Sequence, residues 1–410
     1  MRLLVGLHQL GLGGSQLNAL DLAREMAHRG HQVGLLGVHD GSEPGPLAQR
    51  GRELGLPVWT VRHRRQRPRR GAPCRPAVSA ALTAAVRAHR AELLHVYEYP
   101  LILDAFHGPH RRLGTPLATT VYAMDVPRWL PADPPLVVGT QELVEQAAAF
   151  RPAPWLIEPP VDTDADDPAR VDGGAFRAAY GIGDTDLALV VVSRLEPEMK
   201  AEGIRRAMAA LPLLGDDRLR LLIVGDGPSA ARLRAEAAQV NTALGREAVT
   251  LTGALDDPRP AYAAADIALG MGGSALRAMA FARPLIALGT GGFSRPVTPQ
   301  STDYFLRAGF YGVGDGDLAA APLAAQLAGL TGDAGLRQRL GQWSRQFVLD
   351  RFSLKTAADT LTEVYAAALS RAPGALRRHR SALRIAAHRS AAELAPGGLR
   401  RRIRQVAPWR

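Results

Sequence analysis

The chain has 410 residues, which is more than one compact core usually organises and which suits two α/β domains of ordinary size. Its 47% hydrophobic and 22% charged content is typical of globular proteins, and no apolar stretch approaches the roughly 20 residues of a membrane span. A single cysteine, Cys74, excludes an internal disulfide and a cysteine-rich metal site, which indicates a reducing, cytoplasmic compartment.

The net charge of +11 is concentrated in two segments. Residues 371–410 hold eleven arginines and one acid, Glu393, so this Arg-rich tail carries +10, while six arginines between Arg62 and Arg70 leave the rest of the chain at −5. This distribution disfavours a folded nucleic-acid surface. We expect either a contact with anionic lipid headgroups, peripheral at the inner membrane face, or a disordered, solubilising extension. The arginines that favour lipid contact are Arg377, Arg378, Arg380, Arg384 and those of 400–404.

The first half of the chain alternates strands and helices. A strand begins at Arg2, a loop follows at Gly11–Gly14, and a helix comes next, with Ser15 as its N-cap and Gly30 as its C-terminal stop. Further apolar runs extend a buried parallel sheet, at 92–96, 116–122 and 136–140. These patterns predict an N-terminal, Rossmann-like acceptor domain over residues 1–157.

A segment rich in Pro, Asp and Gly, 158–174, is predicted to link this domain to a second one over 175–353. Strands are expected there at 187–193, 219–224, 249–252, 267–269 and 285–288, with helices at 202–210, 230–244 and 275–281. A helix at 354–370 closes the fold. The predicted class is α/β, with two doubly wound parallel sheets facing across a cleft, since ligands of such sheets lie at the carboxyl ends of the strands.

Two cations follow the first strand of the second domain, in the segment VVSRLEPEMK. Arg194 ends the strand and Lys200 lies at the start of the next helix. Only two lysines occur among the 50 basic residues, so a lysine here favours a site that needs a compact ammonium group. Arginine binds phosphate with two donors, and both cations stabilise a leaving diphosphate. The alternative is an exposed pair at a strand end.

A Gly-rich turn precedes the helix expected near Ser274. Gly272 and Gly273 lack side chains, which lets a phosphate approach the amides of a helix N-terminus. Alone, such a turn often only reverses the chain; together with Arg194 and Lys200 it predicts a diphosphate site in the second domain.

Polar residues also follow strands of the first domain. Gly13 and Gly14 lie in a loop that departs from the dinucleotide fingerprint, so the loop is either a ligand site or a simple turn. Candidates for contact with an acceptor are His95, Glu98, Tyr122 and Asp125. A lone histidine or tyrosine at such a place is often only a hydrogen-bonded core residue.

Five segments, in this order, resemble the GT4-like retaining glycosyltransferases of GT-B fold: GLGGSQLNALDLAREMAHRGHQV, VVSRLEPEMK, LLIVGDGP, VTLTGALDDPRPAYAAADIAL and ALRAMAFARPLI. The resemblance spans about residues 1–370. It implies that Arg194 and Lys200 bind the diphosphate of a nucleotide-sugar donor, and that Gly13 and Gly14 lie beside donor and acceptor. It also implies transfer with retention, by front-face attack assisted by the leaving phosphate, without a metal or other cofactor.

The family that this chain resembles typically carries two glutamates with seven residues between them. This chain has neither of them. The matching positions are Leu269 and Arg277, and a histidine often found after the strand ending near 121 is replaced by Tyr122 and Ala123. Because arginine only donates hydrogen bonds, we expect Arg277 to join Arg194 and Lys200 at the diphosphate. The alternative function is a non-catalytic GT-B binding or partner subunit, and a third is a GT-B epimerase.

The sequence leaves the donor sugar, its base and the acceptor open. Acceptor classes that remain are a small natural product, a lipid-linked saccharide and a growing polysaccharide. These depend on the shape of the site rather than on a motif.

Overall fold

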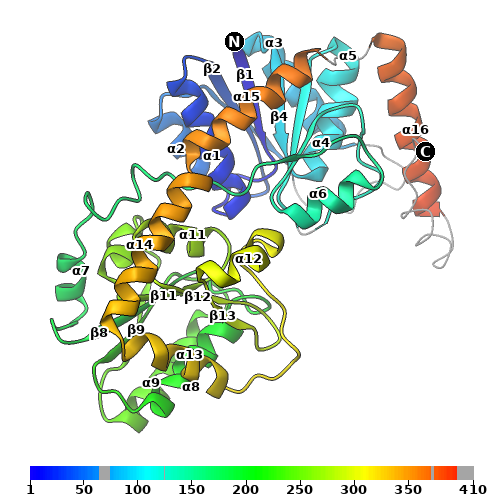
Figure 1. Ribbon diagram of the computed structural model, residues 1–410. Coiled ribbons are helices and arrows are strands. Elements are labelled where there is room, and N and C mark those ends of the chain that lie inside the picture. Colours follow the sequence, from blue (N-terminus) through cyan, green and yellow to red (C-terminus); the bar gives the residue numbers. More distant parts are fainter. Residues whose placement is uncertain (64–73, 124, 371–373, 395–410) are drawn as a thin grey trace. The chain divides into compact units, whose positions relative to one another are not determined.

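A computed structural model describes residues 1–63, 74–123, 125–370 and 374–394. The chain forms two compact units (Figure 1): unit 1 comprises Met1–Pro160 and Leu354–Arg410, and unit 2 comprises Val161–Ser353. The arginines of 64–70 and 400–404 lie outside the described residues.

Unit 1 contains a seven-stranded sheet in the order β3-β2-β1-β4-β5-β6-β7, with every neighbouring pair parallel. The strands are β1 Arg2–Leu7, β2 Gln32–His39, β3 Val58–Arg62, β4 Leu93–Tyr97, β5 Leu117–Val121, β6 Leu136–Val138 and β7 Trp155–Leu156. Side chains alternate between two cores, since Leu3 and Val5 pack on one face and Leu4 on the other. Burial on both faces is why these strands read as continuous apolar runs.

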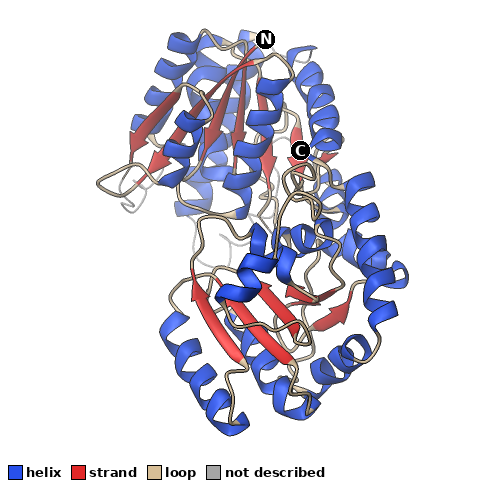
Figure 2. Cartoon of the chain, turned by 90° about the vertical axis from the view of Figure 1, so that its left-hand side faces the viewer, coloured by secondary structure: helices blue, strands red, loops and turns tan. Residues whose placement is uncertain are grey.

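Helices cover both faces of this sheet (Figure 2). Those between the strands are α1 Gly14–His28, α2 Pro46–Glu53, α3 Pro76–His89, α4 Tyr99–Ala105, α5 Arg111–Leu113 and α6 Gln141–Ala148, with a π-helical turn η1 at Phe106–His110. Two helices that follow unit 2 in the sequence also belong here, α15 Leu354–Ser370 and α16 Ala375–Leu394. Gly30, with φ +86°, follows the end of α1 as expected.

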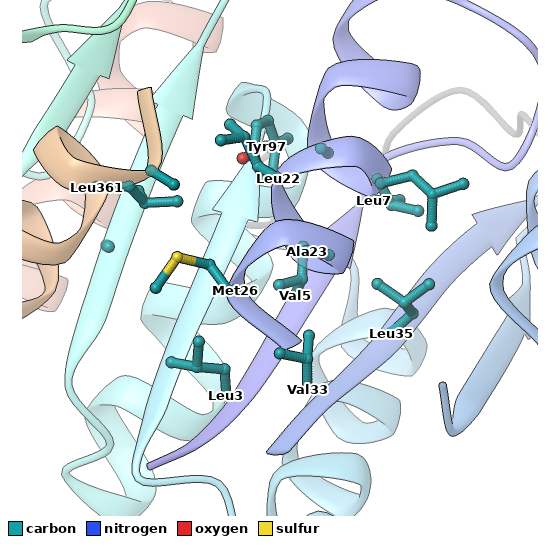
Figure 3. Close-up of a cluster of buried hydrophobic side chains, with 14 of the residues drawn as sticks. Leu3, Val5, Leu7, Leu22, Ala23, Met26, Val33, Leu35, Tyr97 and Leu361 are labelled. Carbon is teal, nitrogen blue, oxygen red and sulfur yellow. The ribbon is translucent and has the colours of Figure 1, made fainter. Parts of the chain in front are cut away.

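The core between α1 and the sheet shows why α15 belongs to unit 1. Leu22, Ala23 and Met26 of α1 pack over Val5, and Leu361 of α15 lies in the same cluster (Figure 3). The buried stripe of α15 follows helical spacing, with Leu354, Ala357, Ala358, Leu361, Val364, Tyr365 and Ala368.

The described part of the Arg-rich tail is a helix that packs on unit 1. Ala382 and Ile385 of α16 are buried in the second core, at 2% and 0% exposure. The alternative of a disordered, solubilising extension is therefore wrong for this part, because two apolar residues on one face of the helix gain a core to pack against. No helix among the described residues is long and apolar enough to span a membrane.

Unit 2 contains a six-stranded sheet in the order β10-β9-β8-β11-β12-β13. The strands are β8 Leu187–Val192, β9 Leu219–Val224, β10 Val249–Gly253, β11 Ile267–Gly270, β12 Leu285–Leu288 and β13 Ser294–Pro296. All pairs are parallel except β12 with the edge strand β13, which was not expected. In β8, Leu189 and Val191 face one core while Ala188 and Val190 face another. The predicted fold class, two Rossmann-like α/β domains, is confirmed.

The helices of unit 2 connect these strands on both faces of the sheet (Figure 2). They are α7 Gly174–Ala179, α8 Ala201–Leu214, α9 Ala230–Leu244, α10 Arg259–Ala264, α11 Gly273–Ala280, a 3-10 turn η2 Pro299–Ser301, α12 Thr302–Ala308, α13 Ala321–Thr331 and α14 Ala334–Arg351. The two ends of unit 2 lie together: the Val161 amide donates to the Phe352 carbonyl at 2.8 Å, and Val161 pairs with Ser353 in a β-bridge.

Candidate functional site

The candidate donor site lies at the carboxyl edge of the unit 2 sheet. Strands β9, β8, β11 and β12 are parallel neighbours, so the turns that follow them share one edge. These turns contain Arg194 and Lys200 after β8, a Gly turn after β9, Gly272–Ser274 after β11 and a second Gly-rich loop after β12. Ligands of doubly wound sheets bind at this edge.

The segment that carries Arg194 is held by the turn after β9. The Ser193 amide donates to the Val224 carbonyl at 2.9 Å, and the Leu195 amide donates to the Asp226 carbonyl at 3.0 Å. At Gly225 φ is +140°, and a Cβ there would lie 1.9 Å from the Ser193 carbonyl oxygen. Gly225 is therefore required for this close approach, which gives the VGDGP turn a structural role.

The Arg194 side chain is 64% exposed, and its guanidinium forms an ion pair with the Glu196 carboxylate. The two residues lie in one tight turn, in which the Glu196 amide donates to the Arg194 carbonyl at 2.8 Å. Exposed pairs of this kind contribute little free energy because water screens them. A diphosphate that approaches Arg194 therefore competes with a weak partner.

Lys200 is half-buried at the N-terminus of α8. Burial lowers the pKa of its ammonium group to about 8. Within the described part of the chain, this ammonium has no hydrogen bond or ion pair. Lys200 is thus a compact cation that an anionic ligand would stabilise.

The turn between β11 and α11 leaves open space beside its glycines. Gly272 has φ +57° and caps α11, and a Cβ added at Gly272 or at Gly273 would meet no atom within 4 Å. The Ser274 hydroxyl donates to the Met271 carbonyl at 3.1 Å, which closes the turn. A phosphate can approach the first turn of α11 closely only where side chains are missing in this way.

Sequence reasoning missed the loop after β12, Gly289–Phe293, and the residue that holds it. The Glu202 carboxylate, in the first turn of α8, accepts hydrogen bonds from the Gly292 amide at 2.7 Å and the Gly291 amide at 3.3 Å. The loop therefore lies against the helix that begins after Lys200. The run GTGG directly after a predicted strand was a signal available in the sequence.

The two positions expected to depart from the family, Leu269 and Arg277, differ in their surroundings. Leu269 is 2% exposed and packs in the core of unit 2, so it presents no polar group to a ligand. Arg277 forms an ion pair with Asp166, in which Nε lies 3.5 Å from Oδ2. Asp166 is 4% exposed and lies in the segment expected only as a link, so sequence reasoning missed it.

Arg277 also lies near a second acid. The pKa of Asp257 is lowered, first by its side-chain hydrogen bond with Arg259 and further by the charges of Arg259 and Arg277. Two acids and a second arginine, Arg259, therefore surround Arg277, and any nucleotide bound there would meet carboxylates as well as guanidinium groups.

In unit 1, Ser15 does not cap α1, contrary to expectation. Gly13 occupies the N-cap position, and the Ser15 hydroxyl donates to the Glu98 carboxylate at 2.8 Å. Gly13 is packed closely, since a Cβ there would lie 2.4 Å from Oε1 of Gln16, whereas a Cβ at Gly14 would meet nothing within 4 Å. Ser15 therefore lies inside the first turn of α1, and its hydroxyl donates to a buried carboxylate instead of capping the helix.

Glu98 connects the ends of two strands of unit 1 with helix α1. It follows β4 and is 8% exposed. Its backbone has φ +67°, a value that residues other than glycine rarely adopt. Its carboxylate also accepts from the Tyr122 amide after β5 at 3.1 Å. Burial raises the pKa of Glu98, and the hydrogen bonds from Ser15 and from the Tyr122 amide oppose that rise. Backbone strain at a buried acid is typical of a functional position.

His8, in the loop after β1, forms a polar pair with Gln16 beside Gly13. Sequence reasoning did not identify this pair. His8 Nε2 lies 3.2 Å from Nε2 of Gln16, and burial, with a smaller effect of Arg75, lowers the pKa of His8 to about 4. A neutral imidazole therefore follows β1, at the same sheet edge as Glu98.

His95 is a core residue. Its Nδ1 lies 2.9 Å from the Tyr365 hydroxyl, its Nε2 lies 2.7 Å from the Thr120 hydroxyl, and the ring is 1% exposed. Both nitrogens have partners inside unit 1, so His95 is not available to an acceptor, which corrects its candidate role. Of the other candidates, Tyr122 is half-buried and Asp125 is exposed.

Both units match known protein families. Residues 13–158 match the family described as glycosyl transferase 4-like domain, and residues 186–332 match glycosyl transferases group 1. Among curated proteins, none matches the chain.

Solved structures with the same fold cover nearly the whole chain. A glycosyltransferase from Rickettsia africae has 14% identity and a TM-score of 0.70, covering 90% of this chain and 98% of its own. Anabaena HepE in complex with UDP has 16% identity and a TM-score of 0.65, covering 89% and 100%. HepE has also been solved with UDP-glucose, and a sucrose-phosphate synthase from Thermosynechococcus elongatus has 15% identity and a TM-score of 0.64, covering 89% and 98%. At these identities the likeness concerns the fold.

Proposed function

The chain belongs to the GT4-like glycosyltransferases of GT-B fold, and from that membership we propose that it transfers a sugar from a nucleotide diphosphate sugar to an acceptor, with unit 2 as the donor-binding unit. The observation that carries the proposal is Lys200, a half-buried lysine whose ammonium has no partner within the described part of the chain. Placing a cation in such a position costs free energy, which an anionic ligand offsets.

The diphosphate is assigned to three features of one sheet edge. Lys200 supplies a compact charge, Arg194 supplies a planar pair of donors, and the open turn at Gly272–Ser274 supplies the N-terminus of α11. Arg277 remains a donor-side residue in this proposal, with Asp166 as its partner. The carboxylate of Asp166 and the guanidinium of Arg277 together offer a ribose both an acceptor and a donor of hydrogen bonds.

The proposed reaction retains the configuration of the anomeric carbon and needs no metal. The bond between that carbon and the phosphate oxygen breaks, and its electron pair leaves with the nucleoside diphosphate. The acceptor oxygen attacks from the same face and passes its proton to the departing phosphate oxygen. Lys200 and Arg194 stabilise the charge that grows on the diphosphate, so they bind the transition state more tightly than the ground state.

The acceptor is assigned to unit 1 by the polar edge around Glu98. The strained backbone of Glu98, its hydrogen bond from Ser15 and the adjacent loop at Gly13 and Gly14 support this assignment. Small natural products, lipid-linked saccharides and polysaccharides all present hydroxyl groups to such an edge.

Binding of nucleoside diphosphates tests the donor site. UDP, GDP, dTDP and ADP are titrated against the full chain by calorimetry, and we expect one of them to bind. Lys200→Ala should weaken that binding by about 10- to 100-fold, the loss expected for one charged hydrogen-bond donor. The matched control is Lys355→Ala, since Lys355 is the other lysine of the chain and lies at the start of α15 in unit 1. Equal binding by both variants would remove the diphosphate assignment.

A second candidate function is donor binding without transfer, by a GT-B partner subunit. It is favoured by Leu269, which is buried in the core where the family carries a glutamate, and by Arg277 at the second glutamate position. The two candidates separate in one assay: release of nucleoside diphosphate from a bound sugar nucleotide, dependent on Arg194, supports transfer, whereas tight binding without release supports the partner role.

A further inference from the structure

Unit 1 contains a pocket, formed where α16 covers η1 and the start of α3. Its volume is about 290 Å³. Cys74, His107, Arg111 and Arg112 line it on one side, and α16 contributes Ala382, Leu383 and Ala386. We call it the α16 pocket. The residues that it takes from α16 lie beyond the residues matched by either family description, whereas those of α3, η1 and α5 lie within the first match.

The polar side of the α16 pocket carries uncompensated positive charge. Among the described residues, no carboxylate forms an ion pair with Arg111 or Arg112. A buried acid close to Cys74, Asp104, is paired with Arg75, which donates to it from its backbone amide at 2.6 Å and from Nε at 2.7 Å. Arg111 also donates from Nε to the His107 carbonyl at 3.3 Å, which leaves its other guanidinium nitrogens for a ligand. An anion in the pocket would therefore meet two guanidinium groups without an acid partner, and an acid already paired with its own arginine.

His107 adds a polar group that has no partner in the protein. The ring is 4% exposed and lines the pocket, and its Nε2 is buried without a hydrogen bond. Burial, together with the charges of Arg111 and Arg389, lowers the pKa of His107 to about 4, so the imidazole is neutral at physiological pH. A buried polar atom without a partner costs free energy, which a ligand that hydrogen-bonds to it recovers.

The opposite side of the pocket is apolar and continues onto the surface of α16. Leu383 both lines the pocket and is 66% exposed, and Leu376, two turns earlier on the same helix, is 78% exposed. Arg380 and Arg384 are exposed on the same helix. Exposed leucines interspersed with arginines are typical of a helix that lies at the surface of an anionic membrane.

We propose that the α16 pocket binds the phosphate headgroup and the adjoining hydrocarbon of an anionic lipid. Arg111 and Arg112 bind the phosphate oxygens, His107 Nε2 donates a hydrogen bond, and the alanines of α16 with Leu383 contact the hydrocarbon. Free phosphate offers the same headgroup chemistry but leaves the apolar side unused. This inference goes beyond sugar transfer and does not depend on the donor site of unit 2.

Cys74 reports occupancy of the pocket directly, because it is the only cysteine of the chain and it lines this pocket. The rate at which a thiol-specific reagent labels the full-length protein is measured with a short-chain phosphatidic acid below its micelle concentration. We expect near-saturating lipid to slow labelling about tenfold, since the reagent reaches only the unoccupied fraction. The uncharged diacylglycerol of the same chain length serves as the ligand control and should leave the rate unchanged.

Two further ligands identify the source of the phosphate. Vesicles of phosphatidylcholine with phosphatidic acid should slow labelling and vesicles of phosphatidylcholine alone should not, which supports a lipid held in a membrane. If inorganic phosphate protects Cys74 as well as the short-chain lipid does, or if none of these ligands protects it, the lipid proposal is overturned.

Paired variants separate the pocket from the general charge of the helix. Arg111→Gln with Arg112→Gln should abolish protection by the short-chain lipid, whereas Arg380→Gln with Arg384→Gln, which removes the same charge from the exposed surface of α16, should retain it. Thermal midpoints of both variants check folding. Loss of protection in the second pair alone would contradict the pocket and assign binding to the helix surface. Nucleoside diphosphate binding, measured in parallel, should be unchanged in all of them.

Discussion

Arg277 and Asp166 form an ion pair in unit 2, with Nε of the arginine 3.5 Å from Oδ2 of a carboxylate that is 4% exposed. The sequence comparison above predicts that this arginine stands where related enzymes carry a glutamate, and its acidic partner comes from a distant segment of the chain. The pair therefore keeps a carboxylate in the neighbourhood while moving it from α11 to the segment before α7.

This pairing predicts an order of stability among variants. Arg277→Ala should lower the free energy of unfolding by about 1–3 kcal/mol, because it withdraws a cation from a buried acid. Arg277→Glu should cost more, since it places a second carboxylate beside Asp166. The double variant Arg277→Glu with Asp166→Asn should recover most of the loss. Urea unfolding measures all three, and an Arg277→Glu variant as stable as the parent would contradict the pair.

The titration of Lys200 predicts a pH dependence of donor binding. The diphosphate binds the protonated ammonium, and the pKa of Lys200 is about 8, so affinity should fall as pH rises from 7.5 to 9.5. The phosphate itself is already ionised over this range. Calorimetric titrations of the preferred nucleoside diphosphate measure the effect. In Lys200→Arg the guanidinium stays charged, so the pH dependence should disappear even where the affinity changes.

Replacement of Gly225 should disrupt the turn that carries Arg194. In Gly225→Ala the new Cβ would lie 1.9 Å from the Ser193 carbonyl oxygen at a φ of +140°, so the segment that carries Arg194 must move. We expect a loss of stability well above 1 kcal/mol and weaker nucleotide binding. Gly245→Ala is the control: its φ of +66° is also unfavourable, but its Cβ would meet nothing within 4 Å, so only the smaller conformational cost of about 1 kcal/mol applies. Thermal unfolding and nucleotide titration compare the two variants.

The burial of His95 should lower the free energy of unfolding in acid. Burial lowers its pKa to about 3, against 6.5 in the unfolded chain, so the folded state resists protonation. The stability that this histidine contributes is present above pH 6.5 and is lost as pH falls from 6.5 toward 3, by up to about 1.4 kcal/mol per pH unit. His95→Gln should flatten the dependence of unfolding free energy on pH between 6.5 and 4.5. His28→Gln, at a side chain that is 68% exposed, should leave it unchanged.

The fold could be predicted because its signals are local. Strand β8 is buried on both faces, so Leu187–Val192 reads as one apolar run that ends at a turn. The candidate phosphate residues follow such runs directly, which placed Arg194, Lys200 and Gly272 at one sheet edge. The antiparallel edge strand β13 gave no signal, because Ser294–Pro296 is short and contains proline.

The contacts that define the sites could not be predicted because they join distant parts of the chain. His95 and Tyr365 are 270 residues apart in sequence, and no spacing rule links a histidine in a strand to a tyrosine in a helix beyond the second unit. Asp166 lies in a segment that reads as a link because it is rich in Asp and Pro, and only packing against α11 buries it. The α16 pocket likewise requires the tail to fold back on unit 1.

The ends of unit 2 meet at the bridge between Val161 and Ser353, and the chain returns to unit 1 directly afterwards, at α15. Along the sequence, unit 2 therefore interrupts unit 1. The residues at its two junctions, Val161 and Ser353, are neighbours in space. Such a module can be exchanged between relatives by recombination at two points without breaking either sheet. Under the proposed assignment of donor and acceptor to separate units, the ligand preference of one unit can change while the sheet of the other stays intact.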